Sequence, residues 1–574
     1  MSFEVEYKKW LAQPNLETYL KTQLENMNET QKEDAFYKDL EFGTGGMRGE
    51  VGPGTNRMNI YTIRKANEGF AQFLLQKGDA VKEAGIVIAY DCRHFSPEFA
   101  MESAKVMASH GIKAYVFESL RPTPELSFAV RHLNAAGGIV VTASHNPPEY
   151  NGYKIYDETG CQLVPAEADQ VIALVDAIHN VFDIEVKSEE ELKAAGLIEI
   201  IGAEIDDIYT EKVKALEINN EINKKDLKIV FTPLHGTANI PARRVLTECG
   251  YEQLFVVEEQ CVPDPNFSTV KSPNPEDASA FAMAIDLGKE KDADILIATD
   301  PDADRVGLAV KDPSGEYVLL TGNQTGAILI HYILSSKKAK GTLPAKGKVF
   351  NTVVTSDMGA KIARSYGFEI VSTLTGFKFI GEQARLIEDT EYEYVFGYEE
   401  SYGYLIGDFV RDKDSIQSVL MCAEAAAFYK EQGKTLYDVL MELYETYGCY
   451  REALVNITLK GKEGADKIQA ILGDFREFTP LTVAERAVVT VEDYETSERT
   501  DLESDTTTEI NLPKSNVLKY TLADGSWFVL RPSGTEPKAK VYIGVIDESI
   551  ESADATIEKI KEDVLARVNN IIGE

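Results

Sequence analysis

Short apolar runs alternate with amphipathic segments along the first part of the chain. Residues 85–90, 114–117 and 138–141 have the composition of buried strands, and residues 97–110 show the spacing of an amphipathic helix. A recurring order of strand and helix is typical of α/β layers built on mainly parallel sheets. The pattern therefore predicts an α/β fold.

The same pattern returns twice further along the chain. Apolar runs at residues 227–231 and 294–298 predict the strands of a second block. Runs at 348–350, 368–371 and 394–396 predict a third. We expect each block to form its own layered domain.

The two ends of the chain differ from this middle part. Residues 1–40 mix polar and apolar positions at helical spacing. From about residue 450 an acidic polar segment, residues 493–508, is followed by strands and a terminal helix, which predicts an α+β domain. The predicted domains are three α/β domains and one C-terminal α+β domain, at residues 1–206, 207–322, 323–450 and 451–574.

Composition supports several large cores and narrows the partners. The chain has 574 residues, a length that exceeds what a single core usually organises. Of these residues, 44% are hydrophobic, which is enough to form large cores. A formal net charge of −35 repels nucleic acid and anionic membranes, so neither is expected as a partner. An anionic substrate would need a few concentrated cations to overcome this field.

Cysteine usage and the N-terminus indicate a cytoplasmic protein. The six cysteines are scattered without a Cys-x-x-Cys pair, which argues against a zinc site or a disulfide framework and fits a reducing cytosol. The first ten residues lack the apolar run of a signal peptide, and no run of about 18 apolar residues predicts a membrane span. The oligomeric state is left open.

Three predicted strands run directly into polar loops. These strand-to-loop junctions lie at residues 140–147, 297–305 and 395–401, one in each predicted α/β domain. Ligands of parallel α/β domains bind at the carboxyl ends of strands. We therefore expect the three loops to face one cleft.

The second of these loops carries three carboxylates at alternate positions, Asp300, Asp302 and Asp304. Such a set suits a hard divalent cation such as Mg²⁺. An EF-hand would need Gly and Glu where Arg305 and Lys311 stand, so that interpretation fails. An acidic surface turn remains the alternative.

The first loop, Thr142-Ala143-Ser144-His145-Asn146-Pro147, places a serine hydroxyl at a tight junction after a buried strand. A serine there can act as a nucleophile, with Lys154 as a nearby cation. The loop is not the Gly-x-Ser-x-Gly elbow of esterases. A purely structural turn explains the small residues equally well.

Two further loops are candidates for phosphate binding. Residues 43–49 are glycine-rich but lack both the P-loop ending and the third glycine of a dinucleotide fingerprint, so neither ATP nor NAD is indicated. They could instead present Arg48 to a phosphate. Residues 531–538 combine an arginine fork, hydroxyl donors and Gly534, a composition suited to an anion. Plain turns are the alternative for both.

Taken together, the loops resemble those of the α-D-phosphohexomutase family. Residues 142–147 resemble its phosphoserine loop, 300–305 its magnesium loop, 397–401 its sugar-binding loop and 531–537 its phosphate-binding loop. The resemblance runs from about Gly43 to Lys538. It implies four domains around a central cleft, with a more mobile fourth domain.

The resemblance also implies a mechanism and a set of site residues. Ser144 would carry the phosphoryl group, through a bisphosphorylated sugar, and Mg²⁺ would be the metal, with glucose 1,6-bisphosphate as activator. The implied catalytic residues are Ser144, His145, Arg48 and Lys154. The implied metal ligands are Ser144, Asp300, Asp302 and Asp304. The implied substrate-binding residues are His235, Arg305, Thr375, Gly376, Glu399, Ser401, Lys413, Arg531, Ser533, Gly534 and Thr535.

The sugar loop and the chain length favour a phosphoglucomutase. The form Glu399-Glu400-Ser401-Tyr402-Gly403 resembles that branch, and a pentose-specific branch carries Ala where Ser401 stands. Mannose and pentose phosphates remain alternative substrates. A magnesium-dependent phosphatase and a non-catalytic sugar-phosphate sensor are the rival classes; the distal clamp argues against the first and the full catalytic set against the second.

Overall fold

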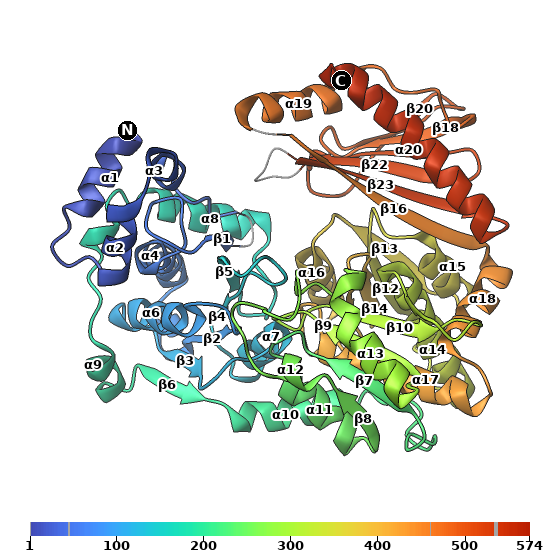
Figure 1. Ribbon diagram of the computed structural model, residues 1–574, viewed down its shortest axis with the longest axis horizontal. Coiled ribbons are helices and arrows are strands. Elements are labelled where there is room, and N and C mark those ends of the chain that lie inside the picture. Colours follow the sequence, from blue (N-terminus) through green and yellow to red (C-terminus); the bar gives the residue numbers. More distant parts are fainter. Residues whose placement is uncertain (1, 44–45, 460, 533–537, 574) are drawn as a thin grey trace. The chain divides into compact units, whose positions relative to one another are not determined.

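The computed structural model describes residues 2–43, 46–459, 461–532 and 538–573 (Figure 1). They fall into two compact units. The first comprises Met1–Phe350 and Phe377–Tyr437, and the second comprises Asn351–Gly376 and Asp438–Glu574. Over the described ranges, none of the helices combines the length and apolar character needed to span a bilayer.

The chain begins with three short helices, as the first 40 residues predict: α1 (Phe3–Leu11), α2 (Thr18–Asn26) and α3 (Glu29–Phe36). Trp10 is the centre of their core. Its ring meets those of Phe36, Tyr61 and Phe182 edge to face at centroid distances of 5.2–5.8 Å. These contacts attach the helices to α4 (Ile60–Gln76).

The first sheet has six strands in the order β1-β5-β4-β2-β3-β6. Strands β4, β2, β3 and β6 pair in parallel, and β5 and β1 extend the sheet by antiparallel pairing. The central strands β2 and β4 are fully buried, as expected for a layered α/β domain. The strands are β1 (Gly46–Glu50), β2 (Ile86–Tyr90), β3 (Ala114–Phe117), β4 (Gly137–Val141), β5 (Tyr150–Tyr156) and β6 (Ile198–Ile201). The helices α6 (Ser96–Ser109) and α7 (Thr123–His132) pack on this sheet.

The second sheet has the order β11-β10-β9-β7-β8. Parallel pairing joins β7 to β8 and β9, and antiparallel pairing adds β10 and β11. The strands are β7 (Lys228–Thr232), β8 (Gln253–Val256), β9 (Ile295–Thr299), β10 (Val306–Lys311) and β11 (Tyr317–Leu319). The three-aspartate loop is the connection between β9 and β10.

The third sheet brings the sugar-loop segment into the first unit. Strand β12 (Gly347–Thr352) pairs in parallel with β14 (Glu393–Glu399), which pairs antiparallel with β15 (Gly403–Leu405). Helix α14 (Gly322–Lys340) packs against β14, and α17 (Ser415–Glu431) against β15. Asp414 caps α17 by accepting hydrogen bonds from the N–H groups of Ile416 and Gln417.

The second unit is dominated by an antiparallel sheet in the order β16-β23-β22-β21-β18-β19-β20, beside the helices α19 (Gly461–Glu477) and α20 (Ile550–Ile572) (Figure 1). Its strands are β16 (Cys449–Thr458), β18 (Arg486–Asp493), β19 (Glu498–Asp501), β20 (Thr506–Glu509), β21 (Leu518–Leu522), β22 (Trp527–Pro532) and β23 (Lys538–Asp547). The unit also contains α15 (Asp357–Ser365) and β13 (Glu369–Thr373).

The acidic segment 493–508 differs from its prediction. It is a hairpin, β19 and β20, that extends the antiparallel sheet, rather than a polar stretch ahead of the domain's strands. Every residue of β20 is exposed, so the strand shows no alternation of apolar and polar residues. Cross-strand side-chain pairs such as Thr500–Thr507 stabilise the hairpin in place of a buried apolar face. The predicted fold class, three α/β domains and a C-terminal domain, is confirmed, while the exact domain boundaries stay a prediction.

Candidate active site

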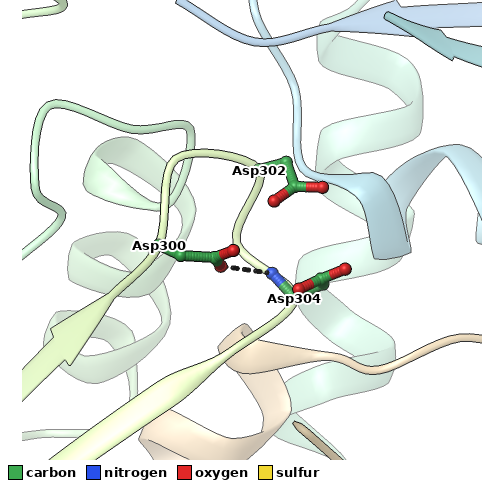
Figure 2. Close-up of side chains that lie close together, drawn as sticks. All are labelled: Asp300, Asp302 and Asp304. Carbon is green, nitrogen blue, oxygen red and sulfur yellow. Dashed lines mark hydrogen bonds between the residues drawn. The ribbon is translucent and has the colours of Figure 1, made fainter. Parts of the chain in front are cut away.

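The loop after β9 gathers three buried carboxylates. One oxygen from each of Asp300, Asp302 and Asp304 lies within 4.8 Å of the others (Figure 2). Asp300 holds the loop closed, because its Oδ1 accepts the N–H groups of Asp304 at 3.0 Å and Arg305 at 2.9 Å. The left-handed φ of 57° at Ala303 completes the tight turn.

The donor set of this loop fits a divalent cation. Oδ1 of Asp302 and Oδ1 of Asp304 are buried and accept no hydrogen bond from the described residues. A buried carboxylate oxygen without a partner is costly, and a hard cation removes that cost. Burial, together with the charges of Asp302 and Asp304, raises the pKa of Asp300.

Ser144 meets this carboxylate loop from the first domain. Its Oγ donates to Asp300 Oδ2 at 2.7 Å and lies 3.2 Å from Nδ1 of His145. Ser144 is 4% exposed and follows β4, so the buried strand delivers the hydroxyl directly to the carboxylates. The predicted meeting of these two strand-end loops is therefore observed.

Two lysines neutralise part of the carboxylate charge. Lys154 of β5 donates to Asp302 Oδ2 at 2.8 Å and to Asp304 Oδ2 at 3.4 Å. Lys413 lies 3.1 Å from Asp304 Oδ2 and 3.2 Å from Asp412 Oδ1. Burial alone would raise the pKa of Asp302. The charges of Lys154 and Lys413, together with the hydrogen bonds of Asp302 to Lys154 and Asp300, outweigh burial and hold that pKa below its usual range.

Arg48 and Lys154 come from neighbouring strands. The antiparallel register of β1 and β5 places Arg48 opposite Gly152 and Gly46 opposite Lys154. Because directly paired residues share a face and side chains alternate along a strand, both cations lie on one face of the sheet. Arg48 is exposed, and its guanidinium donates to Asn146 Oδ1 at 2.8 Å.

His145 and Arg305 complete the charged surroundings of Ser144. Burial and the guanidinium groups of Arg305 and Arg48 lower the pKa of His145 well below its ordinary value, so its imidazole is neutral. Arg305 is half-buried and forms an ion pair with Glu276. A neutral imidazole beside the serine hydroxyl can accept its proton.

The predicted sugar loop joins the same region. Glu399 is buried at the end of β14, and Ser401 is half-buried in the turn that follows. The carbonyl of Tyr402 accepts the N–H of Val306 at 3.0 Å, which ties the turn to the residue after Arg305. The three strand-end loops thus converge within the first unit.

His235 lies close to the aspartate loop, but its ring is engaged elsewhere. Nδ1 is 2.8 Å from the carbonyl of Val262, and Nε2 is 2.7 Å from Thr269 Oγ1. The adjacent Gly236 packs against the aspartate loop so closely that a Cβ there would lie 2.5 Å from the Cα of Pro301. This arrangement supports the loop; the substrate contact expected of His235 stays a prediction.

The remaining predicted residues belong to the second unit or fall outside the described chain. Thr375 and Gly376 follow β13, with a φ of 115° at Gly376. Arg531 is half-buried near the end of β22. Ser533, Gly534 and Thr535 lie outside the described residues.

Sequence reasoning missed one part of this site, Asp91 and Arg93. Both are buried in the loop after β2, the strand next to β4, and Arg93 donates to the carbonyl of Ser144 at 2.6 Å. The sequence pattern that could have identified them is the one that marks the other loops: a buried apolar strand that runs directly into charged residues.

Comparison with known proteins agrees with this architecture. The chain matches the phosphoglucomutase/phosphomannomutase alpha/beta/alpha domains I, II and III and the C-terminal domain, over residues 39–181, 207–315, 321–447 and 454–563. It is 39% identical over 546 residues to a phosphoglucomutase of Staphylococcus epidermidis, covering 95% of this chain and 97% of the relative.

Solved structures share the fold. The open form of parafusin, a phosphoglucomutase from Paramecium, has a TM-score of 0.66 at 20% identity, covering 94% of this chain and 97% of that one. The N-acetylphosphoglucosamine mutase of Aspergillus fumigatus, in complex with GlcNAc-6P and magnesium, has a TM-score of 0.51 at 15% identity, covering 92% and 96%. With four matching domains and a relative 39% identical over nearly its full length, this chain belongs to the phosphoglucomutase/phosphomannomutase family.

Proposed function

We propose that this chain interconverts α-D-glucose 1-phosphate and glucose 6-phosphate, through a phosphorylated Ser144 and a glucose 1,6-bisphosphate intermediate. The observation that carries the proposal is the 2.7 Å hydrogen bond from Ser144 Oγ to Asp300, inside a buried carboxylate triad flanked by Lys154. Membership of the family and a relative named phosphoglucomutase support the reaction class.

The metal proposed for the triad is Mg²⁺. Its ligands would be Asp300, Asp302 and Asp304, together with an oxygen on Ser144. The two orphaned carboxylate oxygens of Asp302 and Asp304 support this assignment, as does the magnesium in the Aspergillus structure. When bound, Mg²⁺ would neutralise charge on the phosphoryl oxygens.

The charges and hydrogen bonds around Ser144 support a role in phosphoryl transfer. Transfer depends on positioning and charge neutralisation more than on covalent chemistry. Lys154 and Arg48 supply positive charge from one face of the sheet. His145 Nδ1 lies 3.2 Å from Ser144 Oγ and is neutral, so it can hold the hydroxyl proton when the serine accepts a phosphoryl group.

Substrate recognition is proposed for two separate regions. Glu399 and Ser401 would contact sugar hydroxyls, and Lys413 the substrate phosphate or ring, in the first unit. Arg531, with Ser533, Gly534 and Thr535, would hold the phosphate that does not react, and Thr375 and Gly376 belong to the same unit as Arg531.

A cytoplasmic location and a glucose 1,6-bisphosphate activator are part of the same proposal. All six cysteines lie within the described residues and are free thiols, which suits a reducing compartment. The activator would phosphorylate Ser144 and so start the cycle.

A substrate panel tests the proposal. Glucose, mannose, glucosamine and ribose 1-phosphates are each supplied with Mg²⁺ and trace glucose 1,6-bisphosphate, and both the 6- or 5-phosphate product and free phosphate are measured. Glucose 6-phosphate as the dominant product supports the proposal. Preferred turnover of another sugar would change the substrate, and release of inorganic phosphate would identify a phosphatase instead.

A further inference from the structure

We propose that Asp91 and Arg93 are positioning residues, which together fix the backbone of Ser144 so that its hydroxyl points at the carboxylate triad. The inference rests on the proposed role of Ser144 as phosphoryl carrier. It adds to the mechanism a pair of side chains that act through the backbone of the carrier loop.

Arg93 gathers the carbonyl groups of the serine loop around one guanidinium. Its side chain is fully buried. One terminal nitrogen donates to the carbonyls of Ser144, at 2.6 Å, and Asn146. The other donates to those of Pro147 at 2.8 Å and Tyr150 at 3.0 Å. Four carbonyl groups on one planar cation fix the course of the loop.

Asp91 holds the same loop from the other side. Its carboxylate accepts hydrogen bonds from the N–H of Arg93 at 2.9 Å, Ser96 Oγ at 2.8 Å and Thr142 Oγ1 at 2.7 Å. Thr142 Oγ1 in turn accepts the N–H of Ser144 at 2.8 Å. The N–H of Ser144 is thus linked to Asp91 through one hydroxyl, and its carbonyl is bound by Arg93.

Ser144 needs such support because of its backbone conformation. Its φ is 50°, in the left-handed region that residues with a Cβ rarely adopt. This conformation turns the side chain out of the direction of β4, toward Asp300 Oδ2 at 2.7 Å. Strained backbone persists at functional sites only where surrounding groups over-determine it. Asp91 and Arg93 restrain the Ser144 backbone in this way, Arg93 at its carbonyl group and Asp91, through Thr142, at its N–H group.

The pair also connects the serine loop to the domain that carries the aspartates. The Arg93 guanidinium lies 4.9 Å from the ring centroid of Phe267, and His94 Nε2 is 2.8 Å from Asn266 Oδ1. Thr269, two residues beyond Phe267, forms a hydrogen bond with the ring of His235. The residue after His235, Gly236, packs on the aspartate loop. Arg93 therefore helps to fix the position of Ser144 relative to the three carboxylates.

Two conservative variants test this role. Thr142→Val keeps the side-chain shape but removes the hydroxyl between Ser144 and Asp91, and Arg93→Lys keeps the charge but cannot reach four carbonyls. Misplacement of a reacting group by about 1 Å can cost roughly 100-fold in rate. We expect kcat, and the single-turnover phosphorylation of Ser144 by glucose 1,6-bisphosphate, to fall on that scale, while KM changes less than threefold. Thr142→Ser should restore both rates.

The control separates positioning from loss of stability. Ile139→Val thins the packing of β4 itself and should lower Tm while leaving kcat unchanged. The proposal is overturned if both test variants keep wild-type kcat, if their activity loss merely follows the unfolded fraction, or if Thr142→Ser is as slow as Thr142→Val. An inactive wild-type protein would instead reject the proposed function, so the two failures are distinguishable.

Discussion

The side chain of Lys413 packs directly against the backbone of Gly403. A Cβ at Gly403 would come within 2.1 Å of Cδ of Lys413, so only glycine leaves room for this side chain in its observed position. From there Lys413 reaches Asp304 Oδ2 at 3.1 Å. The glycine of the predicted sugar loop thereby determines where a cation of the site is placed.

Gly403→Ala should displace Lys413 and slow the reaction while the protein stays folded. The lysine stem is flexible and can move aside, so the added methyl group shifts the ammonium group of Lys413 but does not unfold the protein. We expect a loss of about 10- to 100-fold in kcat/KM, in the range of a misplaced binding group. Gly473→Ala in α19, where an added Cβ meets open space, is the matched control and should retain full activity. Equal activity of both variants would contradict the prediction.

Ser144→Ala should abolish mutase activity, since the proposed phosphoryl carrier is removed. A loss of several orders of magnitude is expected for an enzyme deprived of its nucleophile, on the scale of about 10⁶ known for such cases. Peptide mass analysis of active wild-type protein should find phosphate on Ser144 and none on the alanine variant. Phosphate on another residue of an active variant would show that the carrier lies elsewhere.

Asp302→Asn should weaken Mg²⁺ binding without unfolding the chain. Asp302 is fully buried and pairs with Lys154, so the amide removes one ligand charge. Affinity should fall by more than the roughly 10- to 100-fold typical of losing an outer-shell partner of a metal site. Chelation of the wild type should remove activity, and Mg²⁺ should restore it. Asp292→Asn, an exposed aspartate in the same domain, serves as control; activity that survives chelation would refute the site.

Arg531→Ala should weaken sugar-phosphate binding, because the proposed bidentate contact to phosphate would be lost. A charge-assisted hydrogen-bonded contact of about 1.5–3 kcal/mol corresponds to roughly 10- to 150-fold, expected mainly in KM. Escape of the bisphosphate intermediate should rise. Arg499→Ala, on the exposed hairpin of the same sheet, should change neither quantity. An unchanged KM in Arg531→Ala would place the phosphate clamp elsewhere.

The pair Glu68–His110 should make stability depend on pH. Nε2 of His110 lies 2.7 Å from Oε2 of Glu68. The hydrogen bond that the imidazolium donates to this carboxylate raises the pKa of His110 above 6.5 and lowers the pKa of Glu68 below 4.5. The imidazolium contribution is therefore complete below pH 6.5 and is lost as pH rises through the raised pKa. The carboxylate contribution is complete above pH 4.5 and is lost as pH falls through the lowered pKa.

The His110→Gln variant checks this window. Wild type should exceed the variant in stability by about 1 kcal/mol or less near pH 5.5, because the pair is partly exposed. The difference should shrink toward pH 8. Thermal unfolding at several pH values measures it, and a difference that is independent of pH would contradict the assignment.

The sequence was most informative where a buried strand ends in a polar loop. Strands β2, β3, β4, β7 and β9 lie within one residue of their predicted ranges, because continuous apolar runs bounded by turn residues mark buried parallel strands clearly. The convergence of Ser144 with Asp300 follows from the rule for carboxyl ends of parallel strands.

The rest needed three-dimensional information. The function of Arg93 depends on four carbonyl groups up to 57 residues away, and carbonyls leave no trace in a sequence pattern. The hairpin of β19 and β20 has no buried face and so no alternation. The grouping of residues 351–376 with the C-terminal part rests on contacts such as Lys519 Nζ to the carbonyl of Val353 at 2.8 Å, which links distant segments.

The register of β1 and β5 has a consequence for how this protein can evolve. Arg48 and Lys154 share a face only because Arg48 pairs with Gly152, two residues from Lys154. One residue inserted between Gly152 and Lys154 would send the lysine to the opposite face while the arginine stayed in place. These two strands should therefore tolerate many substitutions in a mutational library but almost no change of length. Selection would act here on spacing as strongly as on residue type.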